Sequence, residues 1–137
     1  MTSLAQWFKE LFFPQKRERT SLALLKKHCV PCEGGVPPMT TEETKKLLRQ
    51  LPGWKLNRQK HLYRQYKFKN FVQAMRFVNA IAKIAERENH HPDMTIQYSK
   101  VQVELWTHAI NGLSENDFIL AAKIEKVTKQ FTKRPIS

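Results

Sequence analysis

The feature of this sequence that most limits its possible folds is an alternation between two hydrophobic periodicities. Over residues 71–85, apolar side chains recur every three or four positions, which is the spacing of one face of an α-helix. Met94, Ile96 and Tyr98 instead alternate with polar residues, as in a strand that buries one face. After a tight turn at Ser99-Lys100, the same alternation continues in Val101, Val103 and Leu105. A chain that carries both patterns must combine helices with a sheet.

Capping residues and helix breakers set the order of the elements. A capping signal precedes each of three helical segments: Thr40 with Glu43, Asn70 with Gln73, and Ser114 with Asp117. The expected helices span residues 41–51, 70–88 and 114–131, and the expected strands span 54–56, 62–68, 94–98 and 101–105. The sequence therefore predicts an α+β domain in the order helix–hairpin–helix–hairpin–helix. Its four-stranded antiparallel sheet would carry helices on one face.

Residues 1–38 are expected to form an N-terminal extension to a domain over residues 39–137. A stripe of apolar side chains predicts an amphipathic helix in this extension: Leu4, Trp7, Phe8, Leu11 and Phe12. We expect that stripe to pack on the domain or on a neighbouring subunit. A helix lying on a membrane surface is the alternative, which Glu10 and the few basic residues of its polar face disfavour.

Composition narrows the class of protein. The net charge of +12 divides into +3 before Pro38 and +9 after it, so the excess is spread over the chain and is no basic tail. Such charge can steer an anionic substrate or maintain solubility, and nucleic-acid binding is the less favoured reading. The apolar runs fall far short of the roughly 18 residues that span a bilayer. Two cysteines without a readable export signal favour a reducing compartment, which we take as the cytoplasm.

Three histidines give the strongest indication of chemistry. His90 and His91 follow the long helix, and His108 follows the last strand, so a four-stranded sheet could bring both ends together. We expect the three side chains to line one concave pocket within one subunit. Imidazole gives and takes protons near neutrality, which suits a reaction that protonates one group and deprotonates another. A solvated turn is the alternative for the adjacent pair. A zinc site is weakly supported, because adjacent side chains rarely bind one metal with good geometry.

The spacing around these histidines resembles the signature of the pterin-4a-carbinolamine dehydratases. The matching residues are Glu86, His90-His91-Pro92, Tyr98, Thr107-His108, Gly112-Leu113-Ser114 and Asp117. The resemblance extends from about Met39 to Thr132, and it implies the same helix–hairpin–helix–hairpin–helix fold. It also implies a hydro-lyase that converts a 4a-hydroxytetrahydropterin to the quinonoid dihydropterin and water. No metal and no bound cofactor are implied.

The resemblance assigns catalytic roles to the histidines: general acid and base to His90 and His108, and contact with the pterin to His91. Glu86, Asn116 and Asp117 complete the expected site as substrate-binding residues. Glu86 could orient an imidazole, and Asp117 could equally be only a helix cap. Family members from animals carry arginine at the position of Asn116, so weaker substrate binding is expected here.

The resemblance does not decide which partners the protein binds or what the Cys29–Cys32 motif does. Animal relatives also serve as a dimerisation cofactor for a transcription factor, so a non-catalytic binding module is the alternative function. Family members form homodimers or homotetramers, and the strand at residues 94–99 or its neighbour is expected to pair with a second copy. The Cys29–Cys32 motif resembles a stretch of longer bacterial and plastid members. A structural loop is favoured over zinc there, because two thiols and His28 fall short of a complete site.

Overall fold

The structure is a computed structural model that describes residues 22–32 and 34–131. The predicted helix at Leu4–Phe12 lies outside these residues. In chain order the elements are α2 (Thr41–Leu48), β1 (Lys55–Leu56), β2 (Leu62–Lys67), α3 (Phe71–Glu88), β3 (Asp93–Gln97), β4 (Lys100–Leu105), the short 3₁₀-helix η1 (His108–Ile110) and α4 (Glu115–Phe131). No helix among the described residues is long and apolar enough to cross a membrane.

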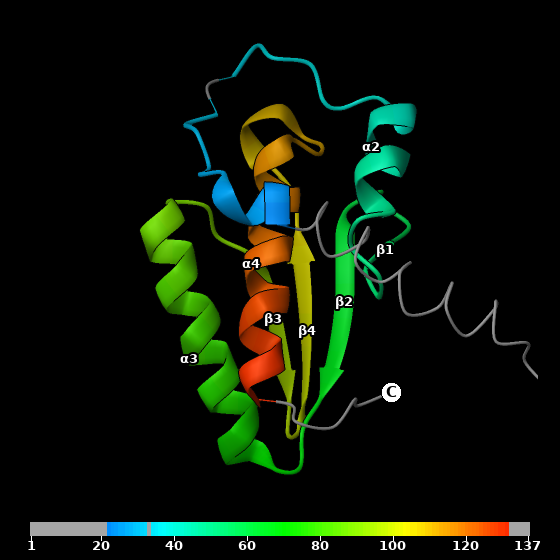
Figure 1. Cartoon of the computed structure of the whole chain (residues 1–137). Helices are drawn as coiled ribbons and strands as arrows, with labels where there is room; N and C mark the ends of the chain where they lie inside the picture. Colours follow the sequence, from blue (N-terminus) through cyan, green and yellow to red (C-terminus); the bar gives the residue numbers. More distant parts are fainter. Residues whose placement is uncertain (1–21, 33, 132–137) are drawn as a thin grey trace, which may run out of the picture.

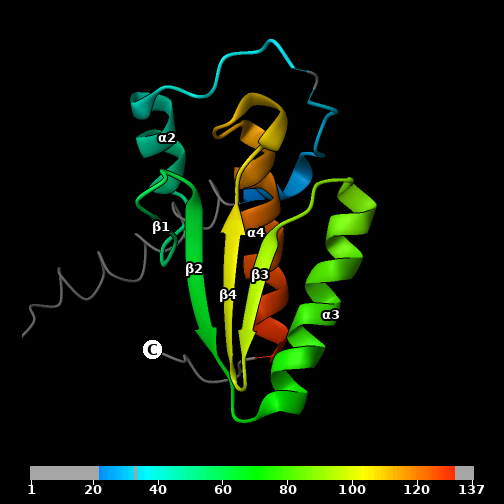
Figure 2. The same cartoon turned by 180° about the vertical axis from the view of Figure 1, so that it is seen from behind.

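The strands form one antiparallel sheet in the order β1-β2-β4-β3. The long helices α3 and α4 lie side by side on one face of it, and the other face carries no described helix (Figures 1 and 2). The predicted fold class and order of elements are confirmed. The division of the chain at residue 38 stays a prediction.

Local signals account for the element ends. Thr40 caps α2 with both bonds of the predicted capping box, and Asn70 accepts a hydrogen bond from the Gln73 N–H at the start of α3. The helix α2 ends at Leu48, earlier than expected, because the next residues continue as a tight turn in which the Leu51 N–H bonds the Leu48 carbonyl. This turn still buries the Leu51 side chain, which explains why the apolar pattern extends past the helix.

The core lies between the sheet and the two long helices. Alternate residues of β4, namely Val101, Val103 and Leu105, are fully buried under α3 and α4. Phe77 of α3 contacts the rings of Tyr66 and Phe68, two buried residues on either side of the exposed Lys67. The predicted face of α3 therefore meets the sheet in one apolar layer. The predicted buried face of the strand at residues 94–98 is wrong for the described chain, because β3 is an edge strand in which Ile96 is 37 % exposed, and Tyr98 lies in the following turn at 69 % exposure.

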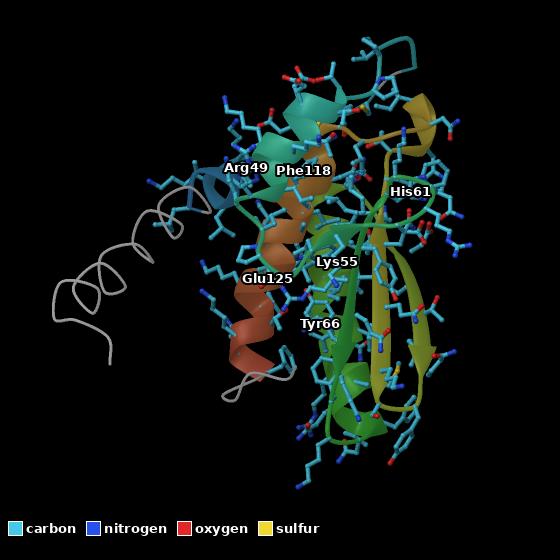
Figure 3. The ribbon with its side chains drawn as sticks, turned by 90° about the vertical axis from the view of Figure 1, so that its right-hand side faces the viewer. Arg49, Lys55, His61, Tyr66, Phe118 and Glu125 are labelled. Carbon is cyan, nitrogen blue, oxygen red and sulfur yellow. The ribbon has the colours of Figure 1, made fainter. Side chains whose placement is uncertain are left out.

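One carboxylate joins the sheet to α4 through three donors. Glu125 accepts hydrogen bonds from Trp54 Nε1 at 3.0 Å, from the Tyr66 hydroxyl at 2.9 Å, and from the Arg64 guanidinium. Figure 3 shows Tyr66 and Glu125 in the space between the sheet and α4. Burial, together with the nearby Glu125 charge, raises the pKa of Tyr66, so its hydroxyl remains a donor. Gly53 has a φ of +93°, a conformation that favours glycine, and a Cβ there would lie 2.7 Å from this guanidinium.

We predict that Glu125→Gln lowers the free energy of unfolding by about 1–3 kcal/mol, because the Arg64 cation loses its counter-charge and three donors compete for one neutral oxygen. Urea denaturation measures the change. Glu115→Gln is the matched control on the same helix, since Glu115 pairs with Lys27 in an exposed ion pair that contributes about 0–1 kcal/mol. Equal losses in the two variants would contradict the prediction.

Candidate active site

The predicted histidines gather at one end of the sheet. The carboxyl end of α3, the start of β3, the end of β4, η1 and the start of α4 all meet there (Figures 1 and 2). His90 and His91 lie in the loop that leaves α3, and His108 is the first residue of η1. The αL conformation of Asn89 ends α3 and turns the chain toward β3.

His90 is fixed by a fully buried carboxylate. Its Nε2 lies 2.6 Å from Asp117 Oδ1, and its side chain is only 12 % exposed. The other oxygen of Asp117 accepts from the Thr107 hydroxyl and from the Ser114 N–H, both at 2.9 Å. Asp117 therefore forms the helix-capping contact expected from its spacing to Ser114 and also holds His90. Since an ionised carboxylate only accepts, His90 Nε2–H is the donor.

His91 and Glu86 form an exposed pair beside this buried one. His91 Nε2 lies 3.2 Å from Glu86 Oε1, with the two side chains 54 % and 80 % exposed. Glu86 precedes His91 by five residues across the end of α3, so the pair depends only on local chain geometry. The predicted contact of Glu86 with an imidazole is present, and its partner is His91.

His108 belongs to a stack of three rings. The centroid of its ring lies 3.7 Å from that of Trp106, and the ring of His61 also stacks on Trp106 with a centroid distance of 4.4 Å. The Trp106 Nε1–H donates to Asp93 Oδ2 at 2.9 Å, and His108 Nε2 lies 3.9 Å from the same oxygen. Glu104 accepts from His61 Nδ1 at 2.6 Å. The stack thus has a carboxylate near each outer ring, Asp93 near His108 and Glu104 at His61, and these two residues are paired across β3 and β4.

The sequence did not predict the roles of Trp106, His61 and Asp93. Strand parity offers a signal for part of the stack, because Glu104 and Trp106 alternate with the buried residues of β4 and so belong to its helix-free face. Figure 3 shows His61 on the side of the sheet away from α4. The meeting of His61 with Trp106 depends on the β2–β4 pairing, which a single sequence does not reveal.

Asn116 does not join the histidines. It is 4 % exposed, and its amide donates to the Val30 carbonyl at 2.6 Å and accepts from the Val30 N–H at 3.0 Å. Both polar ends of the side chain are therefore occupied by backbone. The predicted role of Asn116 in substrate binding stays a prediction, and in this structure its amide is bonded to the backbone of Val30.

The cysteine motif forms a packed loop. Burial, with a smaller effect of the Glu88 charge, raises the pKa of the Cys29 thiol to about 12. The thiol lies 3.6 Å from the Asn116 carbonyl, to which it donates. Among residues 22–32 and 34–131, no three His, Cys, Asp or Glu side chains are grouped closely enough to hold a metal. The burial of Cys29 and its hydrogen bond to the Asn116 carbonyl favour a structural role for this cysteine.

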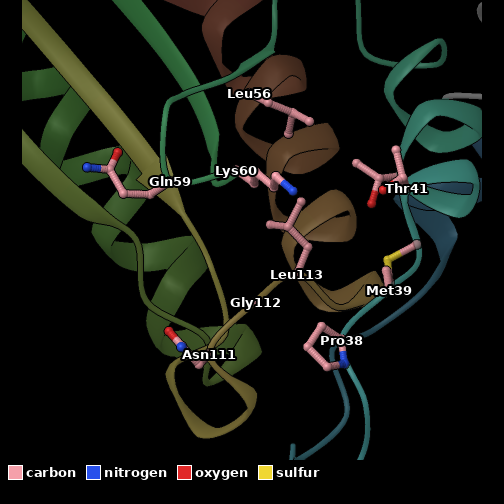
Figure 4. A pocket seen from close by; sticks show the side chains of 10 residues that line it. Pro38, Met39, Thr41, Leu56, Gln59, Lys60, Asn111, Gly112 and Leu113 are labelled. Atoms are coloured by element: carbon pink, nitrogen blue, oxygen red, sulfur yellow. The ribbon is translucent and has the colours of Figure 1, made fainter.

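Two cavities lie near this end of the domain. One of about 270 Å³ lies between α2, the β1–β2 turn and the segment after η1; its lining includes Lys60, Asn111 and Leu113 (Figure 4). The other, of about 480 Å³, lies between α3 and α4 and is lined by Lys83, Lys126 and others. Neither has His90, His91 or His108 in its lining. The expectation that these histidines share one concave pocket stays a prediction.

Comparisons with known proteins agree with the geometry. The family model described as Pterin 4 alpha carbinolamine dehydratase matches residues 37–127. The chain is 58 % identical over 103 residues to a protein from Rickettsia canadensis named "Putative pterin-4-alpha-carbinolamine dehydratase", with 74 % of this chain and 94 % of that protein covered. A protein of the same name from Nitrosospira multiformis is 56 % identical over 102 residues, with 74 % and 89 % covered.

A solved structure supports the same assignment. The transcriptional coactivator/pterin dehydratase from Brucella melitensis superposes with a TM-score of 0.63 at 35 % sequence identity. The match covers 66 % of this chain and 97 % of that protein. The family model alone spans well over half of the sequence. The chain therefore belongs to the pterin-4a-carbinolamine dehydratase family.

Proposed function

We propose that this protein is a hydro-lyase that removes water from a 4a-hydroxytetrahydropterin and releases the quinonoid dihydropterin. The observation that carries the proposal is the pairing of His90 with the buried Asp117, at the same end of the sheet as His91 and His108. Family membership supports this reaction class. We place the activity in the cytoplasm, where it would convert the hydroxylated pterin released by a hydroxylase to the dihydropterin, which a separate reduction returns to the tetrahydropterin.

The reaction needs one proton donor and one proton acceptor. The bond between C4a and its hydroxyl oxygen breaks as the oxygen takes a proton and leaves as water. N5 loses its proton, and the electron pair of that N–H bond forms the C4a=N5 double bond. Both steps fit a pair of imidazoles, one in each protonation state.

The hydrogen bonds of His90 suit it to the basic role. Because Nε2–H of His90 donates to Asp117, the neutral ring presents the lone pair of Nδ1 as its proton acceptor. Asp117 would then hold the ring in one tautomer and orientation and stabilise the cation formed when N5 is deprotonated. We assign N5 deprotonation to His90 Nδ1.

His108 would serve as the acid. It is 62 % exposed and rests with one ring face on Trp106, and Asp93 Oδ2 lies 3.9 Å from its Nε2. Its exposure would let the pterin hydroxyl approach the ring, where His108 would donate the proton that the leaving oxygen takes. The exposed pair of His91 and Glu86 would contact the polar edge of the pterin ring.

We also propose that the protein assembles as a homodimer through β3, or as a homotetramer of such dimers. β3 pairs only with β4, so its other edge is open within the described chain. Ile96 is 37 % exposed and the adjoining Tyr98 is 69 % exposed. An open edge with exposed apolar side chains is usually covered by another strand.

His90→Ala and His108→Ala should each lower kcat by about 10²–10⁴-fold, the usual contribution of a general acid or base. His91→Ala should chiefly raise KM. Stopped-flow turnover of a chemically generated 4a-hydroxytetrahydropterin, with the uncatalysed rate subtracted, measures these effects. Circular dichroism shows that each variant is folded. Full kcat in both the His90 and the His108 variants would remove these residues from the mechanism.

Ile96→Lys should convert the dimer to a monomer, because a charge on an edge strand opposes pairing with a second edge. Multi-angle light scattering at micromolar concentration measures the mass. Val36→Lys is the matched control, since Val36 is an exposed apolar residue in a loop remote from β3. A wild-type protein that is already monomeric would contradict the proposed assembly.

A further inference from the structure

A strap formed by residues 24–32 crosses the ends of both long helices. In Figure 1 this segment, in blue, lies beside the carboxyl end of α3 and the start of α4. Leu24 anchors it in the core with 3 % exposure. The family match begins at residue 37, so the strap lies outside it. Its contacts are nonetheless specific and partly buried.

On the α3 side, the strap binds a buried carboxylate. Glu88 Oε2 accepts the Cys29 N–H at 2.9 Å, and Oε1 lies 3.2 Å from His28 Nδ1 and accepts from Lys123 of α4. The Glu88 side chain is 6 % exposed. Burial alone would raise the pKa of Glu88, but the hydrogen bonds from Lys123, Cys29 and His28 together hold it below its usual value of 4.5. A buried charge satisfied in this way is costly to disturb.

On the α4 side, the backbone of the strap forms a pair of hydrogen bonds with the side-chain amide of Asn116, as two paired strands would with each other. The Asn116 amide exchanges two hydrogen bonds with the N–H and carbonyl of Val30, and its own carbonyl accepts from the Cys29 thiol. Only the backbone of Val30 takes part, because its side chain is 67 % exposed. The side-chain amide of Asn116 therefore fixes the backbone of the strap at Val30.

These two attachment points sit next to the central pair of the proposed active site. Glu88 precedes His90 by two residues, and Asn116 immediately precedes Asp117. The strap thus connects the end of α3 that carries His90 to the start of α4 that carries Asp117. His90 itself lies beyond the αL residue Asn89, in a loop whose position depends on what holds the end of α3.

We propose that the strap is a positioning element of the active site, in which Asn116 and Glu88 are positioning residues that hold His90 Nε2 against Asp117 Oδ1. The effect on turnover rests on the proposed function, whereas the effect on the hydrogen bond does not. Proton transfer is sensitive to such placement: a misplacement of about 1 Å can cost about 10²-fold in rate. The strap would limit the relative movement of the two helix ends.

Asn116→Ala and Glu88→Ala test the proposal, with two readouts. The first is the NMR signal of the His90 Nε2–H proton and its exchange with solvent, measured without substrate. Exchange should become at least about tenfold faster in both variants. The second is turnover, in which kcat should fall at least about tenfold while KM changes less than about threefold.

Two controls separate positioning from general loss of stability. Val30→Ala removes a side chain that the strap does not use, so both readouts should match those of the wild type. Glu125→Gln destabilises the domain at the other end of α4, and it should leave the His90 signal in place at temperatures where it remains folded.

The proposal is overturned if Asn116→Ala keeps both readouts within twofold of the wild type. It is also overturned if Glu125→Gln, at equal stability, accelerates the exchange of the His90 proton as much as the strap variants do. A wild-type protein without dehydratase turnover would reject the proposed function, and the NMR measurement would still decide the role of the strap.

Discussion

The arrangement of the candidate site depends on a single buried charge, the carboxylate of Asp117. Burying a carboxylate is costly unless each oxygen is well solvated by donors. Here the donors come from three separate segments, through Thr107 after β4, the Ser114 N–H before α4, and His90 after α3. The amino terminus of α4 adds a favourable partial positive charge. The hydrogen bonds to the Asp117 carboxylate therefore bring together the ends of three elements. One of these bonds also fixes the position of His90.

The parts of the fold that could be predicted are those with local causes. The stripe of α3, the alternation in β4 and the cap of α2 depend on residues a few positions apart, and each agrees with the structure. The capping role of Asp117 was also visible in its spacing from Ser114. Its bond to His90, 27 residues away, was not, because it depends on how α3 packs beside α4.

Asn116 shows that a resemblance in sequence position does not reveal which partner a side chain contacts. A motif fixes where a residue stands in the chain, whereas the partner that the side chain meets depends on segments outside the motif. For Asn116 that partner is Val30, 86 residues earlier and outside the family match. The ring stack has the same origin, since His61 and Trp106 meet only through the pairing of β2 with β4.

Two histidines can divide an acid and a base role only if their surroundings differ, and here they do. His90 is nearly buried, donates to a carboxylate and keeps a single tautomer, so its free nitrogen is a fixed acceptor. His108 is largely exposed, stacks on Trp106 and has the Asp93 Oδ2 atom at 3.9 Å, so its ring is open to solvent. The proposed pterin substrate is asymmetric in the same sense, because its N5 would give up a proton while the oxygen on C4a would gain one. In the proposed reaction the inner imidazole would serve the first atom and the outer imidazole the second, so the fold would separate the roles by burying only one of two chemically identical side chains.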